Sequence, residues 1–281
     1  MVWVGWRSNG PDGANPNPET GGEVDPDSLR EFVAELAEES GRAIAGMFRH
    51  PDLAVESKTD ESPVTVADRY AETLLRDRIL ERFPDHGIVG EEFGRQNDDA
   101  EYVWVLDPID GTISFVAGVP LFGTLIGLLR DGEPILGAIH QPITRELAIG
   151  TPSGTTFNGE AVRVREDRSL SEATLLTTDP GAVGRHRNLA GFEALWSRTA
   201  LYRGWGDCYG YLMVATGRAD IMLDPIMHPW DIAALVPVIR GAGGVITTWE
   251  GDDPIGGAST VAAAPALHRE VMEILNRTGT S

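Results

Sequence analysis

Two aspartates lie in the segment Asp-Pro-Ile-Asp-Gly-Thr at residues 107–112, directly after the apolar run at 102–106. The β-branched and aromatic run predicts a buried strand, and the Pro and Gly of the segment predict a sharp turn at its end. Two carboxylates on one turn can point at the same place and hold a hard divalent cation. The amides of Gly111 and Thr112 open the element that follows, and a helix N-terminus attracts anions. Cation-binding carboxylates beside phosphate-binding amides indicate metal-assisted phosphoryl chemistry.

Three further acidic elements lie where predicted strands end or predicted helices begin. They are Asp68, the pair Glu91-Glu92, and Asp231. Alone, each has a structural explanation, either as an acid in the first turn of a helix or as a solvated surface pair. Together with residues 107–112 they supply enough carboxylates to hold two Mg²⁺ ions about 4 Å apart, an arrangement that suits phosphoryl transfer. The carbonyl of Ile109 adds one more candidate oxygen ligand.

Composition and charge narrow the classes of partner. The chain has 281 residues and a formal net charge of −20. Nucleic acid is not expected as a partner, because phosphate contacts need clustered Lys and Arg. No run of about 18 apolar residues occurs, so we expect no membrane partner. The first residues lack the features of a secretory signal, and a single cysteine, Cys208, suits a reducing compartment, so a cytoplasmic location is expected.

Basic side chains are almost all arginine, since Lys58 is the only lysine in the sequence. Many acids with almost no lysine suit a protein that stays soluble in high salt. A GC-rich coding bias explains the missing lysines equally well, so both explanations stay open.

Turn residues and apolar periodicity divide the chain into a lead-in and one large unit. Residues 1–26 are rich in Pro, Gly, Asn and Asp and are expected to be flexible. The unit at 27–281 is expected to form a single body, with a metal-binding α+β half at 27–180 and an α/β half at 181–281 that carries the residues for substrate specificity.

Helical spacing begins at Asp27-Ser28, which we expect to be the N-cap of the first helix. Helices are expected near residues 27–47, 66–83, 189–197, 209–216, 230–240 and 266–276. Strands are expected near residues 88–89, 102–106, 122–129, 135–140, 147, 162, 175, 219–223 and 244–247, with a hairpin turn at 130–133. Hairpins followed by β-α-β alternation predict layered sheets and helices.

Four segments carry a family resemblance. They are Val-Thr-Val-Ala-Asp at 64–68, Gly-Glu-Glu at 90–92, Trp-Val-Leu-Asp-Pro-Ile-Asp-Gly-Thr at 104–112, and Trp-Asp-Ile-Ala-Ala at 230–234 followed by Gly-Ala-Gly-Gly at 241–244. In this order and spacing they resemble the inositol monophosphatase-like family of Mg²⁺-dependent, lithium-sensitive phosphatases, over roughly residues 30–275. The resemblance implies an α+β fold, a layered α-β-α-β-α sandwich, and a homodimer.

The resemblance also implies a metal centre and the groups that act beside it. The implied ligands of two or three Mg²⁺ ions, with Mn²⁺ as an alternative, are Glu91, Asp107, the carbonyl of Ile109, Asp110, Asp231 and Asp68. Thr112, paired with Asp68, would orient the attacking water, so these two residues and Glu91 are the expected catalytic residues. The amides of Gly111 and Thr112 would hold the phosphate.

Residues 203–211 and 224–230 resemble the histidinol-phosphatase branch of the family more than the inositol branch. Asp207 and Asp224 could pair with the ammonium group of histidinol phosphate, which inositol phosphate lacks. Their structural alternatives are a helix cap and a turn, respectively. Cys208 is also placed among the expected substrate-binding residues. Its alternative is a buried small side chain, and no nucleophilic role is expected.

The leading hypothesis is a Mg²⁺-dependent phosphomonoester hydrolase that acts on histidinol phosphate in L-histidine biosynthesis, by direct attack of metal-activated water. The alternatives within the enzyme class are an inositol-1-monophosphatase or a phosphatase with broad specificity for small esters. A non-catalytic ligand-binding regulator is a third class, but a decayed site would be expected to lose some of its acids.

Overall fold

The computed structural model describes residues 24–51, 53, 55–57 and 63–276. Most of the predicted lead-in at 1–26 therefore lies outside the described residues. The first described element is a 3-10 turn at Pro26–Leu29, followed directly by helix α1 at Arg30–Met47. Asp25 caps this turn, because its carboxylate accepts the backbone N–H of Asp27. The predicted N-cap at Asp27-Ser28 is therefore wrong. The 3-10 turn already begins at Pro26, because proline suits the first position of a helix, and the cap is the residue before it.

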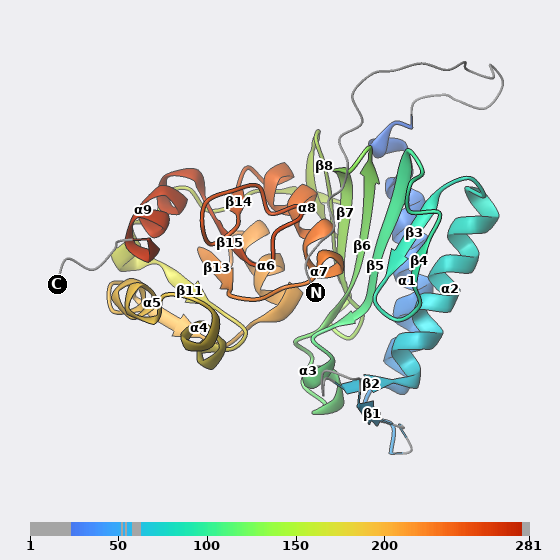
Figure 1. The fold of residues 1–281 in the computed structure, drawn as a ribbon, viewed down its shortest axis with the longest axis horizontal. Helices are drawn as coiled ribbons and strands as arrows, with labels where there is room; N and C mark the ends of the chain where they lie inside the picture. Colours follow the sequence, from blue (N-terminus) through green and yellow to red (C-terminus); the bar gives the residue numbers. More distant parts are fainter. Residues whose placement is uncertain (1–23, 52, 54, 58–62, 277–281) are drawn as a thin grey trace.

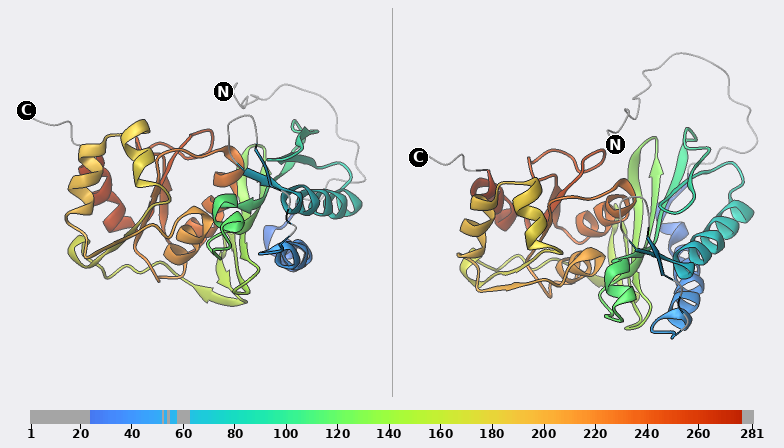
Figure 2. Two further views of the ribbon diagram at one scale, coloured as in Figure 1. Left: turned by 90° about the horizontal axis from the view of Figure 1, so that it is seen from below. Right: turned by 60° about the horizontal axis from the view of Figure 1, so that its bottom comes forward.

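Figures 1 and 2 show a layered molecule in the order helix, sheet, helix, sheet, helix. In the described part of the chain, the first sheet has eight strands in the order β10 (Glu160–Val162), β9 (Gly154–Phe157), β8 (Glu146–Thr151), β7 (Glu133–Gln141), β6 (Gly123–Arg130), β5 (Tyr102–Asp110), β3 (Gly87–Gly90) and β4 (Gly94–Gln96). β3 and β5 run parallel, whereas β5, β6, β7 and β8 form an antiparallel meander. The expected α-β-α-β-α sandwich is confirmed.

The second sheet is built from short strands. Their order is β12 (Leu201–Arg203), β11 (Thr174–Leu176), β13 (Ile221–Asp224), β15 (Thr260–Ala263) and β14 (Val245–Thr247). β11 runs parallel to both of its neighbours, and β15 runs antiparallel to both of its own. β15 was not predicted, because its sequence Thr-Val-Ala-Ala is short and two of its four residues are alanines, which are depleted in strands.

Helices cover both faces of each sheet (Figure 1). They are α1 and α2 (Val66–Arg82) on the outside of the first sheet, α6 (Asp207–Ala215), α7 (Pro229–Ala233) and α8 (Leu235–Gly241) between the sheets, and α4 (Pro180–His186), α5 (Leu189–Trp196) and α9 (Pro265–Leu275) on the far side. α1 packs on β6 and β7, and α8 packs on β7 and β8. These positions confirm the helices predicted near 66–83, 189–197, 209–216 and 266–276. No helix of the described residues has the length and apolar character needed to cross a bilayer.

The outer helices are held by a core around Trp104 of β5. This side chain is fully buried, and its ring meets Phe32 of α1 edge to face, with 6.0 Å between the ring centroids. Truncating a buried aromatic of this kind costs about 3–5 kcal/mol. α1 also passes close to β7 at Gly41, where an added Cβ would lie 2.3 Å from the ring of His140. Glycine at this position therefore allows the helix to reach the sheet.

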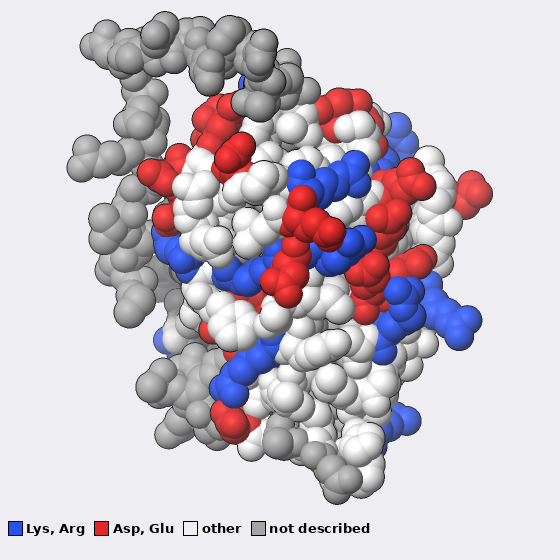
Figure 3. All heavy atoms as spheres, turned by 90° about the vertical axis from the view of Figure 1, so that its right-hand side faces the viewer, with Lys and Arg blue, Asp and Glu red and all other residues white. Residues whose placement is uncertain are grey.

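The face seen in Figure 3 carries acidic and basic side chains side by side. Arg78 of α2 pairs with Glu39 of α1 at 3.1 Å and with Glu81 at 2.9 Å. Exposed pairs of this kind contribute about 0–1 kcal/mol each. The packing of α1 and α2 is therefore stabilised mainly by the apolar core beneath them.

β5 differs from its predicted form in a way that shapes the site. The strand continues to Asp110 instead of ending at residue 106, with a register shift against β6 between Asp107 and Asp110. The sharp turn comes at Gly111, whose φ is 86°, and a short helix α3 (Thr112–Val116) follows. The predicted turn is therefore present at Gly111, but Pro108 takes no part in it, because a bulge accommodates the proline within the strand.

The single helix predicted at 230–240 is two helices, α7 and α8, which meet at Ala234. Pro237 lies in the first turn of α8 and has no N–H to donate to the carbonyl of Ala233. A continuous helix would need that hydrogen bond, so the chain changes direction here. Ala234 then packs against β7, where its carbonyl lies 2.0 Å from the position of a Cβ added to Gly137.

Candidate active site

Carboxylates from two layers meet where β5 ends. Among the described residues, Asp107, Asp110 and Asp231 offer oxygens that all lie within 4.8 Å of one another. In a regular strand, residues three apart face opposite sides of the sheet. The register shift between Asp107 and Asp110 is what brings both carboxylates to one place. Asp107 is only 2% exposed, and the other two are partly buried.

α7 supplies Asp231 from its first turn. Pro229 occupies the first helical position, and Oδ2 of Asp231 accepts the backbone N–H of His228 at 2.7 Å. This capping contact orients the carboxylate and leaves its other oxygen for the cluster. The structural reading of Asp231 as a capping residue and its predicted place in the acidic cluster are therefore both satisfied.

Burial raises the pKa of all three clustered carboxyls. For Asp107 the pKa lies well above its ordinary value, with the charges of Glu91 and Asp110 as the next causes. Burial raises the pKa of Asp110 to about 6. Burial and the charge of Asp110 raise the pKa of Asp231 well above its ordinary value. A divalent cation would remove this repulsion, which makes the cluster a favourable place for one.

The donor set fits a hard cation. Carboxylate oxygens are the ligands that Mg²⁺, Mn²⁺ and Ca²⁺ prefer, whereas softer metals favour thiolates and imidazoles. Cys208 is the one cysteine of the sequence, and its thiol is buried in the hydrophobic core. The residues that meet here therefore suit Mg²⁺ chemically.

Glu91 follows β3 and lies beside β5. Its backbone N–H donates to the carbonyl of Leu106 at 3.1 Å, which extends the parallel pairing of the two strands by one residue. The charge of Glu91 raises the pKa of Asp107, Asp110 and Asp231. Glu91 thus lies beside the three clustered aspartates, and its role as a metal ligand stays a prediction.

Asp68 and Thr112 approach each other from α2 and α3. Thr65 caps α2, and Oδ2 of Asp68 accepts both its backbone N–H at 2.8 Å and its hydroxyl at 2.6 Å. The hydroxyl of Thr112 donates to the carbonyl of Ile109 at 2.9 Å and lies 3.5 Å from Oδ1 of Asp68. Burial, and to a smaller extent the charge of Glu91, raises the pKa of Asp68. The predicted pairing of Asp68 with Thr112 is present as this contact.

Gly111 stands between the acidic cluster and the predicted substrate side. Its φ of 86° is unfavourable for any other residue. An added Cβ would also lie 2.9 Å from Oδ2 of Asp207 and 2.9 Å from the carbonyl of Leu121. Both the backbone conformation and the available space therefore require glycine here.

Two cavities adjoin the cluster, with volumes of about 470 Å³ and 240 Å³. The larger is lined by residues that include Glu91, Gly111 and Thr112. The smaller is lined by residues that include Asp110, Asp224 and Asp231. Residues 178, 179 and 207 border both, so the two cavities are neighbours.

Asp207 and Asp224 lie next to the cluster, and Thr178 contacts both. The backbone N–H of Asp207 donates to the hydroxyl of Thr178 at 2.7 Å, and the backbone N–H of Thr178 donates to Oδ1 of Asp224 at 3.0 Å. Burial raises the pKa of Asp207 well above its ordinary value, with the charge of Asp110 as the next cause. Burial raises the pKa of Asp224 to about 7. The helix-cap alternative for Asp207 is wrong, because the N-cap of α6 is Gly206, which has no side chain. Asp224 ends β13 and accepts the backbone N–H of Thr178, so both aspartates belong to a shared acidic region.

Cys208 contacts Asp110 through both its backbone amide and its buried thiol. Its N–H donates to Oδ2 of Asp110, while its side chain is only 1% exposed. A Cβ added to Gly123 would lie 2.8 Å from the sulfur, which shows how tightly the thiol is packed. We therefore assign Cys208 to holding Asp110 in place, and we give its thiol no contact with a substrate.

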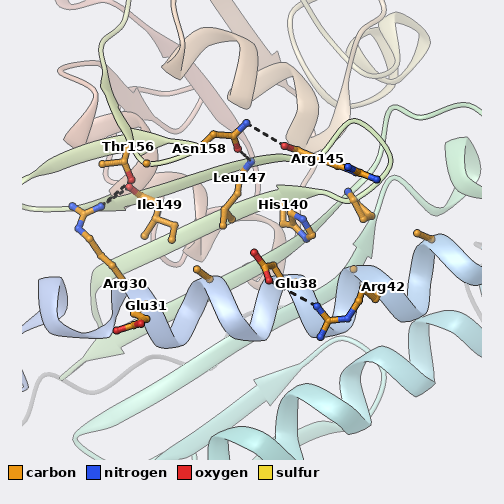
Figure 4. Close-up of a pocket in the computed structure, with 15 residues that line it drawn as sticks. Arg30, Glu31, Glu38, Arg42, His140, Arg145, Leu147, Ile149, Thr156 and Asn158 are labelled. Atoms are coloured by element: carbon orange, nitrogen blue, oxygen red, sulfur yellow. Dashed lines mark hydrogen bonds and ion pairs between the residues drawn. The ribbon is translucent and has the colours of Figure 1, made fainter.

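A larger groove than the two cavities beside the cluster lies elsewhere. It has a volume of about 910 Å³ and runs between α1 and the strands β7, β8 and β9 (Figure 4). Arg30 and Arg42 of α1 and Arg145 of the β7–β8 turn border it. None of the clustered carboxylates lines this groove, so its size alone does not make it the active site.

One known protein family matches almost the whole chain. The model of the inositol monophosphatase family matches residues 25–279. The chain belongs to the inositol monophosphatase family. The match covers both sheets and every residue of the acidic cluster, which agrees with the resemblance drawn from the four sequence segments.

Several known proteins are similar to this chain over most of their length. The chain is 40% identical to a chloroplastic bifunctional phosphatase of Arabidopsis thaliana over 265 residues, covering 93% of this chain and 76% of the relative. It is 39% identical to the histidinol-phosphatase of Chlorobaculum parvum over 244 residues, covering 86% and 94%. Among solved structures, an inositol monophosphatase from Zymomonas mobilis matches with a TM-score of 0.78 and 35% identity, covering 89% and 97%.

Some residues of the site were not predicted from the sequence. Thr178 contacts both Asp207 and Asp224, but the sequence marks it only by its position just after β11. The backbone amide of Cys208 cannot be recognised from residue type at all, because any residue except proline supplies one. Hydrogen bonds of this kind become visible only when the layers are assembled.

Proposed function

We propose that this member of the family is a Mg²⁺-dependent phosphomonoester hydrolase whose substrate is histidinol phosphate. The observation that carries the hydrolase assignment is the meeting of Asp107, Asp110 and Asp231 within 4.8 Å, beside the turn at Gly111. The chemistry that Mg²⁺ supplies when bound there is a lower pKa for water and stabilisation of charge on the phosphoryl oxygens.

The proposed metal ligands are those implied by the family resemblance. For two or three Mg²⁺ ions, with Mn²⁺ as an alternative, they are Glu91, Asp107, the carbonyl of Ile109, Asp110, Asp231 and Asp68. The electrostatic coupling of Glu91 to each clustered aspartate supports its inclusion. The carbonyl of Ile109 is supported by its place between the two aspartates of the bulged strand.

Thr112 is proposed to orient the attacking water. Because its hydroxyl donates to the carbonyl of Ile109, its oxygen can accept a hydrogen bond from water. Oδ1 of Asp68, 3.5 Å from that hydroxyl, could accept the second hydrogen of the same water. The backbone N–H groups of Gly111 and Thr112 are proposed to bind the phosphate oxygens at this turn.

Histidinol phosphate is proposed because the neighbouring cavity is acidic. Asp207 and Asp224 take part in no ion pair within the described residues, and burial raises the pKa of both. An ammonium group would favour their ionised forms and form charge-assisted hydrogen bonds. Histidinol phosphate carries an ammonium group next to its phosphate ester, and the 39% identity to a histidinol-phosphatase supports the assignment.

Inositol-1-phosphate is the second candidate substrate. The inositol monophosphatase structure from Zymomonas mobilis supports it through 35% identity and a TM-score of 0.78. An inositol ring offers only neutral hydroxyl groups to Asp207 and Asp224. Its binding therefore gains less from these two carboxylates than the binding of an ammonium group would. A broad specificity for small esters would combine the two activities.

The test is phosphate release from four esters side by side, with Mg²⁺ and with EDTA. The esters are histidinol phosphate, inositol-1-phosphate, fructose-1,6-bisphosphate and adenosine bisphosphate. The proposal predicts Mg²⁺-dependent release with the highest kcat/KM for histidinol phosphate. A higher kcat/KM for another ester would overturn the substrate and keep the reaction class, whereas no Mg²⁺-dependent release from any ester would overturn both.

The resemblance further supports a homodimer, and the single cysteine supports a cytoplasmic location. Light scattering of the purified protein at several concentrations tests the oligomeric state. A mass of one chain at all concentrations would overturn the dimer.

A further inference from the structure

A buried ion pair on α2 contacts the chain on both sides of Glu91. Glu72 is 0% exposed, and Arg76, one turn later, donates from Nε to Oε1 of Glu72 at 2.8 Å. Neither residue belongs to the cluster of three aspartates. No function was predicted for either residue from the sequence.

The carboxylate of Glu72 holds the turn that follows Glu91. Its Oε2 accepts the backbone N–H of Glu92 at 2.8 Å, and its Oε1 accepts the backbone N–H of Phe93 at 3.2 Å. Arg76 adds a hydrogen bond to the next residue, because its Nη2 donates to the carbonyl of Gly94. The pair thus binds three consecutive residues after Glu91 through their main chain.

The carboxylate of Glu72 also touches the residue before Glu91. A Cβ added to Gly90 would lie 2.0 Å from Oε1 of Glu72, so only glycine lets the carboxylate sit against the strand. On its far side, the backbone N–H of Glu91 is held by the carbonyl of Leu106 at 3.1 Å. The main chain of Glu91 is therefore fixed between β5 and the ion pair.

Charge at such a buried position needs an explanation. Burying a carboxylate and a guanidinium costs several kcal/mol of desolvation, and well-packed apolar residues often serve stability as well or better. Here the hydrogen bonds of both charged groups go to the backbone of the three residues that directly follow Glu91. Their geometry favours a role in placing Glu91 over a role in general stability.

We propose that Glu72, with Arg76, is a positioning residue that sets the metal affinity of the site through Glu91. This inference rests on the proposed function, since it takes Glu91 as a ligand of Mg²⁺. Neither Glu72 nor Arg76 contacts the metal or the substrate in this proposal. Outer residues that orient metal ligands change affinity by roughly 10- to 100-fold when they are replaced.

Glu72→Gln tests the proposal with little change in shape. The glutamine keeps one acceptor oxygen but points an NH₂ group at donors, so one side of the turn loses its hydrogen bond. The expected result is a Mg²⁺ affinity lowered by roughly 10-fold or more, with kcat largely restored at saturating Mg²⁺. The matched control is Glu81→Gln on the same helix, whose pair with Arg78 is exposed, and it should bind Mg²⁺ as the wild type does.

The measurement is isothermal titration of Mg²⁺ into the metal-free proteins, together with thermal unfolding in EDTA and in Mg²⁺. A purely structural role would lower Tm equally in both conditions and leave the affinity unchanged. Wild-type affinity in Glu72→Gln would overturn the inference. If the wild type itself binds no Mg²⁺, the proposed function fails instead.

Arg76→Lys gives a second variant should Glu72→Gln fail to fold. It keeps the charge beside Glu72 but loses the planar fork that reaches both Glu72 and the carbonyl of Gly94. A Mg²⁺ affinity lowered several-fold supports the inference. An unchanged affinity in this folded variant overturns it.

Discussion

The backbone N–H of Cys208 donates a hydrogen bond to Oδ2 of Asp110, across 98 residues of sequence. This contact joins the first turn of α6, in the middle layer, to the end of β5 in the first sheet. Asp110 is thus held by one layer while it faces an aspartate from another helix, Asp231. The site depends on how the layers are stacked as well as on which acids are present.

Asp110→Asn should abolish phosphate release without unfolding the protein. The amide keeps an oxygen for the N–H of Cys208 but removes a negative charge from the cluster. The loss in kcat/KM should exceed the roughly 100-fold loss that can follow replacement of a residue that only orients a metal ligand. Phosphate release and circular dichroism check both parts, and turnover near the wild-type rate in a folded variant would contradict the mechanism.

Gly111→Ala should damage the site beyond its cost in backbone strain. The φ of Gly111 is 86°, and an added Cβ would lie 2.9 Å from Oδ2 of Asp207. Gly159→Ala is the matched control, because Gly159 has the same φ of 86° with nothing within 4 Å of an added Cβ. Each variant should lose about 1–3 kcal/mol of stability from the left-handed backbone.

Only Gly111→Ala should also lose phosphate release. Urea unfolding gives the free energies, and kcat/KM gives the activity. Equal activity in the two alanine variants would show that the contact with Asp207 is unimportant.

Asp207→Asn should change selectivity more than turnover. Losing a charged hydrogen-bond partner for an ammonium group costs about 1.5–3 kcal/mol, so KM for histidinol phosphate should rise by roughly 10-fold or more. KM for inositol-1-phosphate should change little, since that ester has no ammonium group. Steady-state kinetics on both esters provide the check. An equal rise for both would remove the support for histidinol phosphate as the preferred substrate.

The metal-free protein should lose stability as pH rises from 5 to 8. Burial raises the pKa of Asp110 to about 6 and that of Asp224 to about 7, from 3.8 for both. In this range both carboxyls bind more protons in the folded state than in the unfolded state, so their contribution to the free energy of unfolding falls as pH rises through these values. Mg²⁺ should restore Tm most strongly at pH 8, because the cation stabilises ionised carboxylates.

Thermal unfolding in EDTA and in Mg²⁺ at both pH values measures this effect. Asp224→Asn should flatten the dependence on pH in EDTA, since it removes one of the two groups. A metal-free Tm that rises between pH 5 and pH 8 would contradict the assignment.

The acidic residues of the site could be predicted because each lies at the end of an element with a clear sequence signal. Glu91 follows an apolar strand, and the parallel register pairs Gly90 with Leu106, which sets Glu91 next to Asp107. Asp68 and Asp231 lie in first turns that residue types mark well. Local patterns were therefore sufficient for these residues.

Features that depend on packing between layers could not be predicted. The strand bulge that aligns Asp107 with Asp110 has no residue pattern of its own, and Pro108 was assigned to the turn that only Gly111 makes. The break at Ala234 depends on Pro237 and on the close approach to β7. The hydrogen bonds from the backbone after Glu91 to Glu72 join the β3–β4 turn to α2. Nothing in the helical spacing indicates these contacts.

The most direct test of the central claim is a crystal structure with Mn²⁺ and phosphate, using anomalous scattering to locate the metal. We predict anomalous peaks among the carboxylates of Asp107, Asp110 and Asp231, with phosphate at the turn of Gly111. Folded protein that holds Mn²⁺ elsewhere, or shows no peak at these carboxylates at saturating Mn²⁺, would contradict the account.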